Sequence, residues 1–463
     1  MRPTWMILLI FLFVPIFSAN AQGYPVPQDL YGDFAITNVF VLDMNSGQML
    51  PDQTVMVRKG HIIELTDSRT AKIPVGFTLI EGRNKYLIPG LAEMHAHIPV
   101  GSVTDDLVKE TLFLYLSGGA TTIRGMLGHP LHLELKETIV ADNIISPRVY
   151  TSSPSLNGNT VRTKEEAREK VTQYHREGYD FLKIHPGILR EVFDELVVTA
   201  GDVGIPFAGH VPVDVGIDHA IASGYASIDH LDGYIDGLAP GDKKDLMESG
   251  GFFGILYATI ADESKIPGLV TRTKEAGIAV VPTQTLMTRW LSPTPAAEMV
   301  NEPEMRYMSP STRYSWRQGK ERLLNDLNYE QKTYDRFIYL RNKLIKEMFD
   351  NGVLVLLGSD APQVFNVPGF SIHHEILTYR DASLTPFQIL QTGTVNVAKY
   401  FGKEKSFGKI AKGMAADLVL LHDNPLTDIG NVNRIAGVMY RGHWLPRENI
   451  DKILNQIAEK HKE

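Results

Sequence analysis

Apolar and polar positions alternate regularly through the central part of the chain, from residue 87 to residue 402. Short apolar runs bounded by turn residues indicate strands buried on both faces, and the amphipathic segments between them indicate helices. Eight βα units of this kind predict an α/β fold, a (β/α)8 TIM barrel. The first predicted strand ends in His95-Ala96-His97, and the other seven lie at 121–124, 148–151, 181–185, 206–210, 226–230, 278–281 and 353–357.

Helix signals fall between these strands. Thr163 and Glu166 have the spacing of a capping box, and Thr385-Pro386 places a proline at the first position of a helix. The polar and aromatic interval from about 284 to 335, after strand seven, is too long for a βα loop. An insertion there falls at the catalytic face of a barrel, so it is either a lid or a surface loop without catalytic function.

The two ends of the chain carry strand-like runs without helices between them. These runs lie at 34–42, 53–58 and 61–65, with a turn at Lys59-Gly60, and at 416–421 and 435–440, followed by a turn at Arg441-Gly442. Neither end has enough apolar residues to fold alone. We therefore expect residues 22–86 and 403–463 to form one small β-sandwich domain beside a barrel domain of residues 87–402.

The first 21 residues have the pattern of a signal peptide. Arg2 is followed by an apolar run from Met6 to Phe17 and by Ala19-Asn20-Ala21, which fits a cleavage site. The run is shorter than the ~20 residues of a membrane-spanning helix, so an uncleaved anchor is the less favoured alternative. We expect an exported protein, periplasmic or secreted, with no membrane span after cleavage.

Composition narrows the classes of function. The chain has 43% hydrophobic and 22% charged residues, a formal net charge of -8 and no dense block of basic residues, so no nucleic-acid partner is expected. A small-molecule substrate is expected, and a homo-oligomer is compatible with the chain. The absence of cysteine rules out thiolate ligands and nucleophiles. Any metal must be held by histidine and carboxylate groups, which suits a hydrolytic site.

Metal-binding side chains follow several of the predicted strands. His95 and His97 are two residues apart on one strand and therefore point to the same face. Because the carboxyl ends of barrel strands meet at one mouth, these two imidazoles would face the side chains at the ends of other strands. Those side chains are Lys183, His210, His230 and Asp360. Each residue alone has an ordinary explanation, but six at the same end of one barrel predict a metal site.

With these residues the chain resembles the amidohydrolase superfamily, in particular its prolidase-like and imidazolonepropionase-like metal-dependent hydrolases. The resemblance covers nearly all of the chain after the predicted signal peptide. It is carried by Pro89-Gly90 before His95 and His97, Gly119–Arg124, Gly178–Lys183, Gly209–Val211, Ser227–His230, Gly358–Asp360, Phe370–Glu375, Gly408–Gly413, Ala416–Leu418 and Asn424–Leu426.

The resemblance implies two divalent ions, with zinc as the first choice for nitrogen and oxygen ligands. His95, His97 and Asp360 would bind one ion, and His210 and His230 the other. Lys183 would carry carbon dioxide as a carbamate that bridges both. Ions ~3.5–4 Å apart would hold a hydroxide for attack on a carbonyl, and Asp360 would act as catalytic base and then acid.

One segment departs from the pattern of the prolidase-like relatives. Where many of them carry a histidine after strand three, this chain has Asn157 and Asn159, which either form a turn or donate a hydrogen bond to the substrate. His129, His132 and His185 are alternative donors. Further candidates for contact with a substrate carboxylate are Arg124, Tyr234 and Arg289.

We therefore predict a binuclear amidohydrolase that cleaves an amide bond in a dipeptide or an N-acyl amino acid. The alternatives are a cyclic amide or lactone hydrolase and, less favoured, a mononuclear deaminase, which would not need Lys183. A non-catalytic binding protein of the same fold would be expected to have lost some of the six residues.

Overall fold

The central part of the chain forms a parallel β-barrel surrounded by helices. The structure is a computed structural model that describes residues 30–462, apart from residues 103, 142–143, 245–246 and 248. Seven parallel strands follow one another in the sheet in the order of the sequence, from β6 to β12. Their bounds are β6 Leu91–Ala96, β7 Ala120–Gly125, β8 Arg148–Leu156, β9 Phe181–Ile184, β10 Phe207–Gly209, β11 Ser227–Asp229 and β12 Ala279–Val281.

The predicted eighth strand closes the barrel with a few backbone bonds. Val355 forms a parallel bridge with Val280, and Ala361 forms one with Ala96. The Met94 amide also donates to the Leu357 carbonyl at 2.8 Å. Residues 353–361 therefore join β12 to β6, which confirms the predicted barrel although this segment is not a regular strand.

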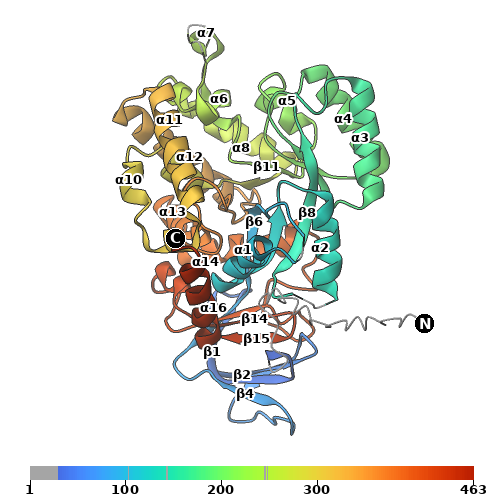
Figure 1. Ribbon diagram of the computed structural model, residues 1–463, viewed down its shortest axis with the longest axis vertical. Helices are drawn as coiled ribbons and strands as arrows, with labels where there is room; N and C mark the ends of the chain where they lie inside the picture. The colour runs from blue at the N-terminus through green and yellow to red at the C-terminus, as the bar shows by residue number, and fades with distance from the viewer. Residues whose placement is uncertain (1–29, 103, 142–143, 245–246, 248, 463) are drawn as a thin grey trace, which may run out of the picture.

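Helices cover the outside of the barrel, as the amphipathic segments predict (Figure 1). On α12 the buried Phe337, Leu340, Leu344 and Met348 repeat at helical spacing and face the core. The longer helices are α1 Asp106–Ser117, α2 Pro130–Val140, α3 Lys164–Glu177, α4 Arg190–Val203, α8 Ile266–Glu275, α11 Pro310–Leu327, α12 Gln331–Asp350 and α13 Ser371–Asp381. Shorter ones are α5 Gly216–Ala222, α14 Pro386–Thr392, capped by Thr385 as predicted, and α15 Val395–Tyr400.

Two long segments extend from the carboxyl ends of neighbouring strands. The predicted insertion after β12 is helical and contains α9 Gln284–Trp290, α10 Ala296–Met299, η5 Pro303–Tyr307 and α11. A second long segment, which the sequence did not reveal, lies between β11 and β12. It contains α6 Tyr234–Leu238, α7 Gly241–Lys244, η2 Phe252–Gly254, η3 Leu256–Thr259, η4 Glu263–Lys265 and α8.

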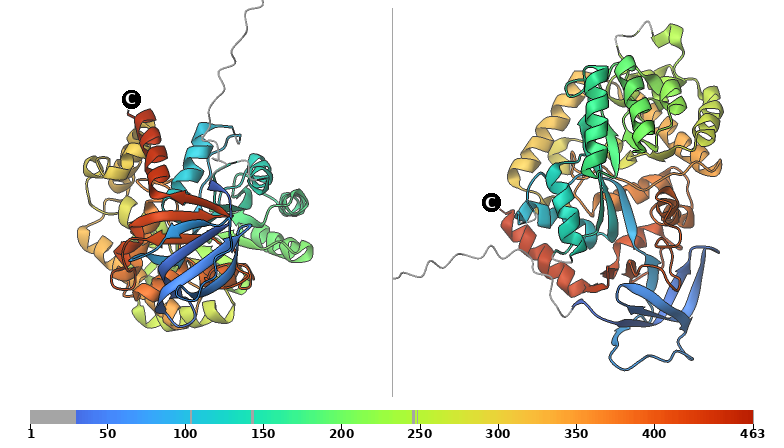
Figure 2. Two further views of the ribbon diagram at one scale, coloured as in Figure 1. Left: turned by 90° about the horizontal axis from the view of Figure 1, so that it is seen from below. Right: turned by 90° about the vertical axis from the view of Figure 1, so that its right-hand side faces the viewer.

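The two ends of the chain form one mixed sheet at the other end of the molecule (Figures 1 and 2). The expected β-sandwich takes the form of a single hydrogen-bonded sheet in the order β15-β14-β13-β5-β1-β2-β3, with β4 paired to β1. Turns at Lys59-Gly60 and Arg441-Gly442 join β2 to β3 and β14 to β15, as predicted. The strands are β1 Phe34–Asp43, β2 Gln48–Arg58, β3 His61–Asp67, β4 Thr78–Glu81, β5 Tyr86–Pro89, β13 Leu418–Leu421, β14 Ile435–Tyr440 and β15 His443–Pro446.

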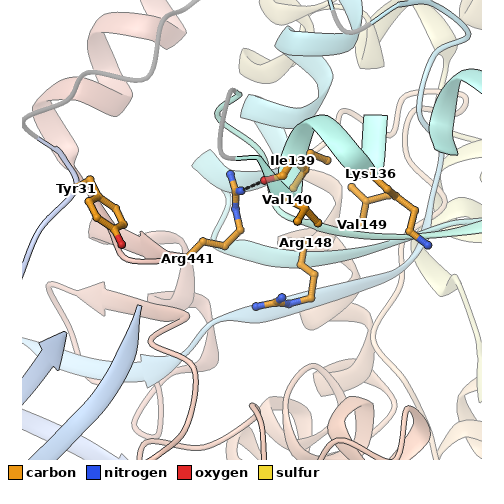
Figure 3. A pocket seen from close by; sticks show the side chains of 7 residues that line it. All are labelled: Tyr31, Lys136, Ile139, Val140, Arg148, Val149 and Arg441. Atoms are coloured by element: carbon orange, nitrogen blue, oxygen red, sulfur yellow. Dashed lines mark hydrogen bonds between the residues drawn. The ribbon is translucent and has the colours of Figure 1, made fainter. Parts of the chain in front are cut away.

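The small sheet lies at the amino ends of the barrel strands, because only Gly90 separates β5 from β6. The C-terminal helix α16, Arg447–Lys460, returns to the barrel, where Lys460 pairs with Asp106 and Glu110 of α1. A cavity of about 440 Å³ between α2, the start of β8 and Arg441 lies at this same end (Figure 3). The Arg441 guanidinium donates to the carbonyls of Ile139 and Ile144 there. This cavity is therefore at the end of the barrel opposite the predicted site.

The predicted signal peptide, residues 1–21, lies outside the described residues, and it stays a prediction. Among the helices that the structure describes, none combines the length and the apolar character that a membrane span requires.

Candidate metal centre

The barrel brings the six predicted metal-binding residues to one mouth. Ligand atoms of His95, His230 and Asp360 all lie within 4.8 Å of one another. The ring centroids of His95 and His230 are 4.4 Å apart, those of His230 and His210 4.5 Å, and those of His95 and His97 5.5 Å. Residues separated by up to 265 positions in the sequence thus form one cluster, because each lies at or just beyond the carboxyl end of one of the segments that form the barrel.

Asp360 lies among the imidazoles. Its Oδ1 is 2.7 Å from Nε2 of His97 and 3.7 Å from Nε2 of His95, and its Oδ2 is 3.7 Å from Nδ1 of His230. The Asp360 backbone has a φ of 63°, which is uncommon for a residue with a side chain. Strained backbone of this kind is often found at functional sites.

Two carboxylates orient the imidazoles of His95 and His210 through contacts with their Nδ1 atoms. The Nδ1 atom of His95 is 2.7 Å from Asp229, and that of His210 is 2.9 Å from Asp232. Since each contact uses Nδ1, the Nε2 atom of each ring is available for a ligand. Burial lowers the pKa of His210 to about 3 and the pKa values of His95 and His230 well below the ordinary range. These three imidazoles are therefore neutral, which is the form that binds metal ions.

Lys183 is completely buried, and its Nζ has no hydrogen-bond partner among the residues described. Burial lowers the pKa of this amine to about 8, although Asp229 and Asp360 oppose the shift. An unpaired buried amine is costly, so a structural role is a poor explanation for it. The lowered pKa also leaves part of the amine neutral near pH 7, the form that reacts with carbon dioxide. Lys183 and the neutral histidines thus fit the donor set of a metal centre.

Glu93, a residue that sequence reasoning missed, fixes the loop that carries Asp360. Its Oε1 accepts from the amides of Ser359 at 2.7 Å and His95 at 3.1 Å, and its Oε2 accepts from the Ser359 hydroxyl at 2.5 Å. Burial raises the pKa of Glu93 to about 8. The signal was present in the sequence, because Glu93, His95 and His97 alternate and share the inward face of one strand.

Helices α12 and α13 support the part of the barrel mouth that holds His230 and the end of β12. The buried Arg341 donates to the carbonyls of His230 and Pro282, both at 2.7 Å. Glu375 accepts from the amides of Gln284 and Thr285 at the start of α9, at 2.9 and 2.6 Å. Two helices that follow the insertion, α12 and α13, therefore hold the end of β12 and the backbone of His230.

Three predicted substrate contacts are corrected by the structure, because their polar atoms are bound to other parts of the protein. Arg124 is fully buried and makes a two-oxygen contact with Asp229 at 2.9 and 3.1 Å. The Tyr234 hydroxyl is buried and lies 2.8 Å from Thr273 Oγ1 of α8. Arg289 pairs with Glu302 of the insertion and donates to the Phe365 carbonyl at 2.9 Å.

The residues predicted to donate a hydrogen bond to the substrate, Asn157, Asn159 and the alternative histidines, lie in different surroundings. Asn157 forms a turn, because its Oδ1 accepts from the amides of Asn159 and Thr160, and Asn159 itself is exposed. His129 caps α2 by accepting from the Leu131 amide at 3.3 Å. His185 lies beside the cluster, with its ring centroid 5.0 Å from that of His210.

An aromatic wall from the segment between β11 and β12 adjoins the cluster. The Phe253 ring lies 5.8 Å from the His210 ring, with an interplanar angle of 19°, and 5.2 Å from the His230 ring. Phe252 lies beside it and contacts Trp290 with a centroid separation of 5.0 Å. The φ of Phe253 is 51°, an outlier for a bulky residue. No periodic pattern in the sequence indicated this wall.

A barrel with imidazoles, a buried lysine and a carboxylate at the carboxyl ends of its strands is typical of metal-dependent hydrolases. A family model of the amidohydrolase family matches residues 86–445. The chain belongs to the amidohydrolase family, which confirms the predicted resemblance and places the protein in a class of hydrolases acting on carbon–nitrogen bonds.

Solved structures with the same fold include bottromycin amidohydrolase, which is 22% identical with a TM-score of 0.67, over 93% of this chain and 91% of that chain. A Xaa-Pro dipeptidase with bound methionine in the active site is 16% identical with a TM-score of 0.64, over 90% of this chain and 100% of that chain. Among curated proteins, adenine deaminase 3 of Rhizobium meliloti (strain 1021) is 23% identical over 215 residues, 43% of this chain. That match spans 36% of the length of the deaminase.

Proposed function

We propose that this protein is an exported, metal-dependent hydrolase of amide bonds in dipeptides or N-acyl amino acids, with two ions at the barrel mouth. The observation that carries the proposal is the buried amine of Lys183, which has no partner among the described residues and lies near the imidazoles of His95 and His210 and the carboxylate of Asp360. A carboxylated Lys183 would turn this amine into an anionic oxygen ligand. Zinc is the first choice for such nitrogen and oxygen donors.

His95, His97 and Asp360 would hold one ion, His210 and His230 the other, and the Lys183 carbamate both. When bound, the ions would supply Lewis-acid activation of water and of the scissile carbonyl. Asp229 and Asp232 would keep His95 and His210 in the orientation for binding, since each accepts from Nδ1.

Asp360 would move the proton. Its carboxylate lies at the centre of the cluster, within 3.7 Å of three imidazoles. There it can accept a proton from the attacking water and deliver it to the leaving amine as general base and then general acid. Glu93, by binding Ser359, would keep the Asp360 loop in register with the strand that carries His95.

The experiment is hydrolysis of a panel of dipeptides and N-acyl amino acids by protein loaded with zinc in the presence of bicarbonate, with elemental analysis of the same samples. We expect two ions per chain and release of the free amino acid. One ion or none under these conditions would contradict the binuclear site. Cyclic amides and lactones belong in the panel, because the same activated water would open them.

Deamination is the second candidate, because two matching curated relatives are adenine deaminases. Adenine is therefore included in the panel, with ammonia as the measured product. A single-ion deaminase would have no use for Lys183, so we favour amide hydrolysis.

A further inference from the structure

His185 lies at the barrel mouth but is not one of the six proposed metal ligands. It follows β9 and is two residues after Lys183, and its ring lies 5.0 Å from that of His210. This spacing is similar to those among the proposed ligands themselves. The side chain is only partly buried, whereas Lys183 is fully buried, so His185 is nearer to the entrance.

A short hydrogen-bonded chain determines which nitrogen of His185 carries its proton. The Asn157 Oδ1 accepts from two backbone amides, those of Asn159 at 2.8 Å and Thr160 at 3.2 Å. These amides can only donate, so the other group of the Asn157 side chain is the NH2 group. That group donates to the Ser155 hydroxyl at 2.7 Å.

The Ser155 hydroxyl lies 2.5 Å from Nδ1 of His185. The oxygen accepts from Asn157, and the only other hydrogen-bond partner of this hydroxyl among the described residues is Nδ1, so its single proton is donated to Nδ1. A neutral imidazole whose Nδ1 accepts must carry its proton on Nε2. No hydrogen bond of this Nε2 is formed within the part of the chain that the structure describes. His185 thus offers an N–H donor, with Ser155 and Asn157 fixing its direction.

We propose that His185 is a catalytic residue that donates this hydrogen bond to the carbonyl oxygen of the scissile amide as negative charge develops on it. The inference rests on the proposed function, because it assumes attack on an amide carbonyl at the neighbouring metal centre. This role of His185 also assigns a function to the segment of residues 155–159, which differs from the prolidase-like relatives. Asn157 and Ser155 do not contact the substrate but are positioning residues for His185.

The donor role excludes a role as a further metal ligand, since an Nε2 that carries a proton has no free lone pair. Two other candidate histidines have hydrogen bonds elsewhere in the protein. The Nε2 atom of His132 is directed to the Pro99 carbonyl at 3.4 Å, and His129 caps a helix.

The test compares His185→Gln with His185→Asn. Glutamine can place an amide N–H near the position of Nε2, whereas the shorter asparagine reaches only the position of Nδ1. Loss of one such donor lowers kcat by about 10²–10³-fold in other hydrolases. We expect a loss of this order for His185→Asn, little change in KM, and partial recovery in His185→Gln. Both variants should keep the zinc content of the wild type in elemental analysis.

A second readout does not depend on turnover. In ¹⁵N-histidine-labelled, zinc-loaded protein, the signals missing from His185→Gln identify His185, and their shifts distinguish a protonated, an unprotonated and a metal-bound nitrogen. We expect a proton on Nε2 and none on Nδ1. In Ser155→Ala the Nδ1 signal should shift because its donor is lost.

The outcomes separate this inference from the proposed function. Wild-type protein that hydrolyses no amide of the panel rejects the function, and the tautomer then decides whether His185 is a donor. An active wild type with an equally active His185→Asn overturns the catalytic role. Zinc loss in His185→Asn, a metal-bound Nε2 signal, or equal losses in both variants would overturn the donor role.

Discussion

The buried contact between Arg124 and Asp229 should support both the barrel and the metal centre. The Arg124 guanidinium donates to both oxygens of Asp229, to the Met94 carbonyl and to the hydroxyls of Ser227 and Tyr400, at 2.7–3.1 Å. Neither Arg124 nor Asp229 has any exposed surface. Asp229 in turn binds His95 at 2.7 Å, so the ion pair is linked to a proposed ligand.

The perturbation is Arg124→Met, which retains much of the volume and removes the charge. Leaving one partner of a buried ion pair without the other costs about 3–5 kcal/mol. Folded domains have unfolding free energies of about 5–15 kcal/mol. The variant should therefore lose a large fraction of its unfolding free energy but remain folded over most of this range. Because Asp229 orients His95, the affinity for zinc should also fall by about 10–100-fold.

The assay is urea unfolding of the metal-free protein, followed by zinc titration against a competing chelator. The matched control is Arg83→Met, because Arg83 is 72% exposed and lies 4.0 Å from Glu81. Such surface pairs contribute about 0–1 kcal/mol. A loss below about 1 kcal/mol in Arg124→Met, with unchanged zinc affinity, would refute the linkage between this ion pair and His95.

Three further predictions concern other parts of the molecule. Lys183→Ala should lose zinc and activity, and short carboxylic acids should restore part of the turnover; full activity without them would contradict the carbamate. Glu263, which accepts from Lys343 and Arg336 at 2.7 and 2.6 Å, has its pKa lowered by these bonds to about 2. Since the unfolded value is about 4.3, its stabilising effect is complete above that pH and is lost as the pH falls towards 2. Glu263→Gln should cost about 1 kcal/mol at pH 7, after allowance for solvent screening, and less at pH 3, measured by urea unfolding. Export should yield a mature chain beginning near Gln22 in N-terminal sequencing, whereas an intact Met1 in the exported fraction would contradict cleavage.

The barrel and the cluster at its mouth could be predicted because their signals are local. A buried parallel strand is a continuous apolar run, and His95, Lys183, His210 and His230 each occur at the end of such a run. Strand eight was predictable for the same reason, although its pairing at Val355 is slight. The carboxyl ends of barrel strands must converge, so the position in each run was enough to place these side chains together.

The predictions for Arg124, Tyr234 and Arg289 failed for a common reason. Their residue types suit an anionic ligand, but whether a cation or hydroxyl is free depends on what packs against it. Tyr234 meets Thr273 of α8, and Arg289 meets Glu302 of the insertion. Such partners come from segments whose placement no local pattern in the sequence reveals.

The amino-acid sequence by itself determined the alternation of strands and helices, the hairpins of the terminal sheet, and the residues at the strand ends that define the family. These follow from periodicity and from chain connectivity. Only the tertiary structure decided the orientation of His185 by Ser155 and Asn157, the loop held by Glu93, and the wall formed by Phe253. Hydrogen bonds and ring contacts of this kind join separate segments, and their energy depends on distances and burial that exist only after the chain has folded.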